Sequence, residues 1–279
     1  MVCLAGMKAL MLPTVFAVFL GAPLAASAQV CPQQKLEAAR FTPGEALEFK
    51  LDALGAEVGS FDLHVELPPA SDRLRAALLV RSRAKTSAFV STNVKRFDAY
   101  ASVLLGRDLA PLRYKEDVDE GDLHKAQEID FPPAGGALAV RATKGGEPDP
   151  FQVEAGPAVR DILSTLYLLR AQPMKPGQPV CIEVFAGRKV WRLQGQVAAR
   201  ETIDTPLGKF ATLRVDAEAT LANDGRVKRG AHIWVTDDAR RLPLVAIAEI
   251  RGRVIRAQLV SAVGGGRKVS EQGPRHIGR

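Results

Sequence analysis

A strict alternation of apolar and polar residues constrains the fold more than any other feature of the chain. Between Ala211 and Leu221 every odd-numbered residue is apolar, and every even-numbered residue is polar or charged. Successive side chains of a β-strand point to opposite faces of the sheet, whereas a helix gathers positions three and four apart. A helix cannot produce this pattern. The stretch is therefore predicted to be a strand with one buried and one solvated face.

The same period of two continues on both sides of this stretch. Asn223-Asp-Gly225 offers residues that tolerate positive φ, and the alternation resumes afterwards, which predicts a hairpin. An antiparallel meander of strands is expected near 180–185, 189–200, 209–221, 226–236, 241–251 and 253–261. Further strands are expected near 45–53, 60–67, 73–83, 94–105, 112–118, 123–131 and 138–143.

About a dozen strands at regular spacing predict an all-β, mainly antiparallel fold, either a barrel or a strongly curved half-barrel, with a sandwich as the alternative. One segment near 157–170 departs from this period. Its apolar residues recur at helical spacing: Val159, Ile162, Leu163, Leu166 and Tyr167. Pro157 suits the first turn of a helix, and Pro173 ends it. We expect an amphipathic helix that covers one open end of the sheet.

The first 28 residues have the pattern of a secretory signal peptide. Lys8 precedes an apolar stretch, which leads to the small residues Ala26-Ser-Ala28. Pro13 and Pro23 interrupt the stretch, which is shorter than the roughly 20 apolar residues of a membrane span. We expect cleavage after Ala28 and a periplasmic mature protein without a transmembrane span.

Two cysteines remain after this cleavage, Cys31 and Cys181. Val30 precedes the first of them, where a lipoprotein signal has a small residue, which argues against a lipid anchor. An oxidising compartment allows the two cysteines to form a disulfide. The sequence leaves the pairing open, because a disulfide requires close, specific geometry and the sequence gives no distance.

The mature chain divides into a lead, a domain and a tail. Residues 29–40 form the lead, residues 41–262 a single β-rich domain, and residues 263–279 a disordered basic tail that starts with a glycine run. The tail holds part of the formal net charge of +7, so the domain itself is only weakly basic. We expect no nucleic-acid partner, and contact of the tail with anionic lipid is the alternative to a merely solvated end.

Four sequence blocks carry a resemblance to a known family. They are 41–49 (FTPGEALEF), 161–170 (DILSTLYLLR), 205–210 (TPLGKF) and 233–243 (IWVTDDARRLP). In this order the chain resembles the bacterial exported proteins of domain of unknown function 3108, from about residue 41 to 259. The resemblance implies an antiparallel β-structure in the cell envelope and supplies no established activity. The last block is also similar to the strand-turn-strand of lipoprotein-carrier proteins, which hold acyl chains inside a curved sheet.

Standard catalytic and metal-binding motifs are missing from the sequence. It contains no G-x-S-x-G, H-E-x-x-H, Walker or C-x-x-C motif. The four histidines, at positions 64, 124, 232 and 276, are scattered and are interpreted as solvated. Residues 117–122 resemble a calcium loop, but the glycine is one place early and the closing glutamate is missing, so an acidic turn is favoured. We expect no metal and no cofactor.

The candidate ligand-binding residues are Asp161, Ser164, Tyr167, Arg170, Trp191 and Trp234. Those on the predicted helix belong to the family's block and could line a pocket mouth, although an acid at a helix start is also explained by the helix dipole. The two tryptophans fall on strands, where aromatic residues fill a core or line an apolar cavity. Ser164 has no base partner in the sequence, so nucleophilic catalysis is not expected.

The predicted inward positions carry many small residues: Ala211, Ala217, Ala219, Ala231, Ala246 and Ala248. They would leave space inside a large barrel. We therefore expect a non-enzymatic protein that binds an apolar or amphipathic envelope molecule, such as a lipid, in its concavity. The alternative is a structural or assembly module that docks on an envelope protein complex or glycan through strand edges or the tail. An enzyme that uses Asp161 and Ser164 is the third hypothesis.

Overall fold

The computed structural model describes residues 31–32, 35–37, 41–250, 252–264 and 267–268, which all lie within the unit Cys31–Arg279. The predicted signal peptide and cleavage site, part of the lead, His276 and most of the tail lie outside these residues. Neither described helix is long and apolar enough to cross a membrane.

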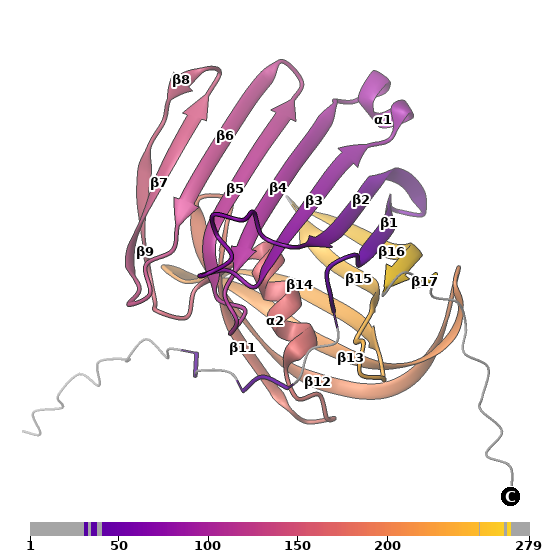
Figure 1. Cartoon of the computed structure of the whole chain (residues 1–279). Coiled ribbons are helices and arrows are strands. Elements are labelled where there is room, and N and C mark those ends of the chain that lie inside the picture. The colour runs from indigo at the N-terminus through magenta and orange to yellow at the C-terminus, as the bar shows by residue number, and fades with distance from the viewer. Residues whose placement is uncertain (1–30, 33–34, 38–40, 251, 265–266, 269–279) are drawn as a thin grey trace, which may run out of the picture. The chain divides into compact units, whose positions relative to one another are not determined.

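The first half of the chain forms an N-terminal meander in which each strand pairs antiparallel with its neighbour (Figure 1). The strands are β1 Ala46–Ala53, β2 Ala56–Glu66, β3 Leu78–Thr86, β4 Phe97–Leu105, β5 Pro111–Glu120, β6 Leu123–Asp130, β7 Gly136–Lys144, β8 Glu147–Pro148 and β9 Phe151–Ala155. β7 pairs with both β8 and β9.

The second half forms a C-terminal meander. Its strands are β10 Arg160–Asp161, β11 Pro179–Ala186, β12 Lys189–Thr205, β13 Gly208–Leu221, β14 Asp224–Thr236, β15 Pro243–Ile250, β16 Arg253–Gly264 and β17 Arg267–Lys268. The strands from β11 to β17 pair antiparallel in chain order, and β10 pairs parallel with β11. β16 and β17 extend beyond the predicted end of the domain at residue 262.

The last long strand joins the first, because β16 pairs antiparallel with β1. The two meanders therefore form one continuous sheet that runs from β9 through β1 and β16 to β10. The prediction of an all-β, mainly antiparallel fold is confirmed. A closed barrel of about a dozen strands is not, because the described chain has seventeen strands and no pairing of β9 with β10 or β11. β10 has only two residues before the chain turns into a helix, so this edge cannot extend far enough to close the sheet.

The predicted helix is α2, Ile162–Ala171, and it begins five residues later than expected. Arg160 and Asp161 are extended and pair with Val184 and Phe185 of β11, so the helix starts only after them. In Figure 1, α2 lies between the two meanders. It does not merely cover an open end of the sheet, because seven of its ten residues are buried.

Two hydrophobic clusters enclose α2. Leu163 and Tyr167 belong to the larger cluster, with residues of the N-terminal meander. Leu168 and Leu169 belong to the second, with Val180 and Ile182 of β11 and with residues of β12 to β14. Apolar side chains on opposite sides of the helix therefore hold it against both halves of the sheet, which fixes the polar residues of α2 in the interior.

The alternating stretch that predicted a strand forms most of β13. Leu213, Val215 and Leu221 are buried, and Ala217 and Ala219 are half-buried on the same face. Ala211 is exposed, which corrects its predicted inward position. A register irregularity of β12 between Val197 and Ala199 lies opposite Arg214 and Val215 in the middle of β13. The other small inward residues, Ala231, Ala246 and Ala248, are half-buried.

Candidate functional site

Arg170, in the last turn of α2, forms a buried ion pair with Glu45. Its Nη1 and Nη2 donate to Glu45 Oε1 and Oε2 at 2.7 and 2.8 Å, and the two side chains are 0% and 5% exposed. Nε donates to the carbonyl oxygen of Arg241 and Nη2 to that of Arg240, both at 3.1 Å. The charges are therefore paired and hydrogen-bonded, as burial in the interior requires.

Tyr167 and Phe41 complete this group. The Tyr167 hydroxyl donates to Glu45 Oε1 at 3.1 Å. The Phe41 ring meets the Tyr167 ring edge-on at 4.8 Å, and the Arg170 guanidinium lies 5.0 Å from both ring centres. Burial raises the pKa of Tyr167, so its hydroxyl stays protonated and donates. The group joins the residues just before β1, the helix α2 and the turn at Arg240.

Asp161 and Ser164 form a capping box at the start of α2. Asp161 Oδ1 accepts from the backbone N–H groups of Leu163 and Ser164 at 2.8 and 3.1 Å. Ser164 Oγ donates to Asp161 Oδ2 at 2.6 Å, and it also lies 3.0 Å from the Asp161 N–H. Burial raises the pKa of Asp161, while these hydrogen bonds oppose the rise. Both side chains are thus engaged in holding the first turn of the helix.

Asp161→Ala is expected to lower the free energy of unfolding by about 1–2 kcal/mol, because two buried helix N–H groups lose their acceptor. Asp161→Asn should cost less, since its amide oxygen can still accept from both N–H groups. Urea denaturation of the purified variants measures both values. Equal losses in the two variants would contradict this role of the cap.

Trp191 and Trp234 lie apart from the predicted residues of α2. Trp191, in β12, donates through Nε1 to the carbonyl oxygen of Ala186 at 3.2 Å, and the Arg229 guanidinium lies 4.9 Å from its ring centre. Trp234, in β14, donates through Nε1 to Glu201 Oε1 at 2.6 Å. The structure therefore divides the six candidate residues among a helix cap, an ion pair and two separate strands, and their binding of a ligand stays a prediction.

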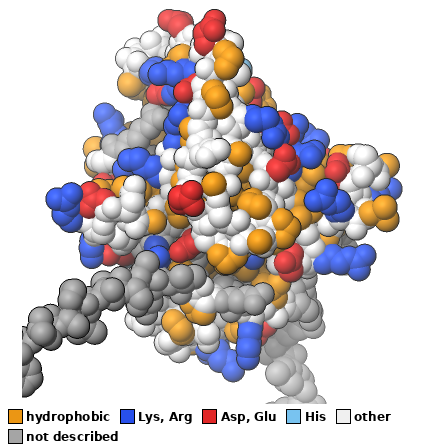
Figure 2. Space-filling view, turned by 90° about the vertical axis from the view of Figure 1, so that its left-hand side faces the viewer, with side chains coloured by type: hydrophobic (Ala, Val, Ile, Leu, Met, Phe, Trp, Pro, Cys, Tyr) orange, Lys and Arg blue, Asp and Glu red, His pale blue; other side chains and the backbone are white. Residues whose placement is uncertain are grey.

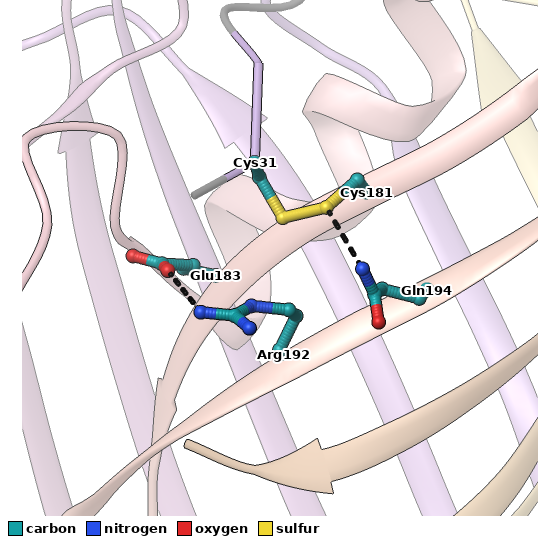
Figure 3. Close-up of a disulfide and its surroundings, with 5 residues drawn as sticks. All are labelled: Cys31, Cys181, Glu183, Arg192 and Gln194. Carbon is teal, nitrogen blue, oxygen red and sulfur yellow. Dashed lines mark hydrogen bonds and ion pairs between the residues drawn. A yellow bond between two sulfur atoms is a disulfide. The ribbon is translucent and has the colours of Figure 1, made fainter. Parts of the chain in front are cut away.

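A disulfide joins Cys31 to Cys181 of β11, with Cα atoms 5.3 Å apart (Figure 3). Gln194 Nε2 lies 3.8 Å from Cys181 Sγ. Two residues after Cys181 on β11, Glu183 Oε1 accepts from Arg192 Nη2 at 3.3 Å. Beyond Cys31, the N–H of Glu37 donates to the carbonyl oxygen of Ala171 at 2.6 Å, at the end of α2. The disulfide thus anchors the lead beside the helix that the lead contacts.

The three described histidines each lie beside an aspartate. His64 is 3.3 Å from Asp62, His124 is 3.0 Å from Asp119, and His232 is 2.8 Å from Asp216. Asp119 raises the pKa of His124. Within the part of the chain that the structure describes, no group of three or more His, Cys, Asp or Glu side chains could hold a metal ion. The acidic stretch 117–122 spans the end of β5 and the turn into β6.

A cavity of about 620 Å³ lies on the inner face of the N-terminal meander, where β4 to β7 and β9 approach the turn between β11 and β12. Its apolar lining includes Phe97, Val118, Leu123 and Phe151. Arg188 of that turn lies 3.8 Å from the Phe151 ring centre and binds Asp149 Oδ2 at 2.5 Å. The cavity therefore has an apolar wall and a charged rim.

The polar floor of this cavity is formed by Glu116 and Gln127, which lie opposite each other on β5 and β6. Gln127 Nε2 donates to Glu116 Oε2. Burial raises the pKa of Glu116, and the nearby Asp161 carboxylate adds to the rise. Closer to the rim, Lys125 Nζ donates to Glu120 Oε2 at 2.8 Å.

This cavity was not predicted from the sequence. The available signal was a polar residue at an inward position of a strand, since Glu116 lies between Tyr114 and Val118 on one face of β5.

The outer face of the N-terminal meander differs from the lining of the cavity. Figure 2 shows the side on which β7 and β9 lie, where basic and acidic side chains are mixed and hydrophobic side chains form small patches.

Comparison with known proteins gives a family and a fold. The model of a family described as "Protein of unknown function (DUF3108)" matches residues 47–254. No curated protein matches the chain. A crystal structure of a β-barrel-like protein of domain of unknown function DUF1849 from Brucella abortus matches with a TM-score of 0.55 and 8% identity, over 81% of this chain and 99% of that one. At this identity the likeness shows the fold alone.

Two further crystal structures match with lower TM-scores. One is a candidate exported protein with a YmcC-like fold from Bacteroides fragilis, with a TM-score of 0.31, 7% identity and coverage of 82% of this chain and 100% of that one. The other is a candidate lipoprotein from Parabacteroides distasonis, with a TM-score of 0.33, 10% identity and coverage of 83% and 100%.

Proposed function

The chain belongs to the DUF3108 family of proteins of unknown function, and we propose that it is an exported, non-enzymatic protein of the cell envelope that binds an amphipathic molecule in the cavity of its N-terminal meander. The ligand class is a lipid or a similar molecule with an apolar chain and a charged end. The cavity is the observation that carries this proposal.

Its size and lining support binding. Ligand pockets have volumes of roughly 300–1,000 Å³ and combine apolar walls with a few polar groups. This cavity, of about 620 Å³, pairs the apolar side chains of Phe97, Val118 and Leu123 with charged groups at the rim. An apolar chain would be shielded from water by the wall, and a charged end would remain at the rim.

Export and the lack of an activity rest on separate observations. A disulfide persists in oxidising compartments such as the periplasm, which agrees with the signal-peptide pattern of the first 28 residues. Ser164, the candidate nucleophile, donates to the carboxylate of Asp161 within the helix cap and is fully buried. A nucleophile needs an adjacent base and access to substrate, so this pair supports a structural role.

Filling the cavity tests the proposal. Ala142 lines the cavity on β7, and Ala139 lies on the same strand with its side chain exposed. Delipidated wild-type protein is expected to bind hexadecanoic acid, and Ala142→Phe to bind it at least tenfold more weakly, about 1.4 kcal/mol. Ala139→Phe is the matched control and should bind like wild type. Native mass spectrometry and isothermal titration calorimetry measure the binding, and wild-type protein that binds no acyl lipid would refute the proposal.

A docking module is the second candidate function. The short helix α1, Ala88–Asn93, connects β3 to β4 and carries Phe89, which is 72% exposed; Val94 beyond it is 73% exposed. Exposed apolar side chains of this size mark interaction sites when they gather on one surface. Pull-down from envelope extract discriminates the two functions, because the docking module would retain a protein or a glycan and the binding protein a small amphiphile.

A further inference from the structure

We propose that the cavity selects a linear amphiphile with an anionic end at Lys144 and a hydrogen-bond donor, a hydroxyl or an ammonium group, at Glu116. This inference rests on the proposed function and specifies the chemistry of its ligand. It assigns one role to the floor of the cavity and another to the rim.

Glu116 has acceptor capacity that the protein does not fill. A carboxylate has about four lone-pair sites. Gln127 Nε2 donates to one of them, and the Tyr114 hydroxyl, which is also hydrogen-bonded to Glu116, occupies a second. Asp161 contributes further negative charge nearby. A donor from a bound ligand would stabilise this desolvated carboxylate, and an ammonium would also offset its charge.

Lys144 is the basic residue of the rim that is available to an anion. Lys125 is paired with Glu120 at 2.8 Å, and Arg188 with Asp149 at 2.5 Å. Lys144 lines the same cavity and is exposed, and among the residues that the structure describes it has no ion-pair partner. A carboxylate at the end of an apolar ligand can therefore bind it without displacing a partner.

The strand register sets the distance between the two groups. Glu116 lies opposite Gln127, which lies opposite Ala142, and Lys144 follows Ala142 by two residues on the same face of β7. Two strand spacings and two residues along the strand separate the two Cα atoms by about 12 Å. An extended chain of about ten carbons spans this distance, given C–C bonds of about 1.5 Å. Val118 and Leu123 line the cavity along with these groups.

Three ligands of equal chain length test the inference: decanoic, 10-hydroxydecanoic and 10-aminodecanoic acid. Wild-type protein is expected to bind 10-hydroxydecanoic and 10-aminodecanoic acid at least about tenfold more tightly than decanoic acid, because each adds one hydrogen bond to the Glu116 carboxylate. Isothermal titration calorimetry at neutral pH measures the three dissociation constants.

Two variants separate the floor from the rim. Glu116→Gln keeps the shape of the side chain but removes its charge. The preference for 10-aminodecanoic acid over decanoic acid should therefore fall at least about tenfold. Lys144→Gln should weaken the binding of all three ligands by a similar factor, because each has the same carboxylate. Asp117→Asn is the matched control, because it removes the neighbouring carboxylate on the opposite face of β5 and should change nothing. Thermal unfolding of each variant verifies that it is folded.

The outcomes distinguish this inference from the proposed function. Binding of all three ligands with equal affinity, or a preference that survives in Glu116→Gln, would overturn the role of Glu116 and leave the amphiphile-binding function standing. If the wild-type protein bound none of the three ligands and did not bind hexadecanoic acid either, both this inference and the proposed function would be overturned.

Discussion

Arg170→Ala is expected to lower the free energy of unfolding by about 3–5 kcal/mol, the largest effect of any single substitution proposed for this protein. The substitution leaves the Glu45 carboxylate buried, with the Tyr167 hydroxyl as its remaining donor in this group. An uncompensated charge in the interior carries the full penalty of its desolvation. Urea denaturation followed by circular dichroism measures the loss.

An exposed ion pair provides the control. Arg113 Nε lies 2.8 Å from Asp130 Oδ1, with side chains 41% and 49% exposed. Arg113→Ala is expected to cost less than about 1 kcal/mol, because solvent screens the pair. The double variant Glu45→Leu/Arg170→Met should recover most of the lost stability, since it removes both charges and keeps apolar volume. A similar loss in Arg113→Ala and Arg170→Ala would mean that burial of the pair has no special effect.

The strands of this fold could be predicted where one face of the strand is buried and the other is exposed to solvent. β13 is such a strand, and its pattern placed Leu213 and Val215 correctly in the interior. The six residues of α1 are too few to show a helical period, so the sequence did not reveal this helix. The turn after β13 also differs from expectation. It consists of Ala222 and Asn223, so Gly225 belongs to β14.

The candidate site was harder to predict, because its residues come together only in the folded chain. The helix block supplied Tyr167 and Arg170, but their partner Glu45 lies 125 residues from Arg170 in the sequence. A sequence cannot show whether such a residue meets a ligand or a buried carboxylate. The cavity depends on register in the same way, since Glu116 and Gln127 face each other only through the pairing of β5 with β6.

The double variant Cys31→Ser/Cys181→Ser is expected to lower the free energy of unfolding by about 2–5 kcal/mol. The disulfide links residues 150 positions apart, so its removal enlarges the conformational freedom of the unfolded chain. It also releases the segment whose Glu37 N–H caps the end of α2. Replacing both cysteines avoids a free thiol. Chemical denaturation with and without reductant measures the effect, and only the wild type should respond to reductant.

The disulfide and the ion pair between Glu45 and Arg170 hold the same part of the chain, so their effects should not be independent. Between Cys31 and Glu45 in the sequence, Glu37 donates to the carbonyl oxygen of Ala171 at the end of α2 and Phe41 packs on Tyr167. Releasing one end allows the segment to detach more easily when the other is also lost. A double-mutant cycle that combines the cysteine variant with Arg170→Ala should therefore show a coupling energy of about 0.5–3 kcal/mol. Strict additivity would show that the two anchors stabilise separate parts of the fold.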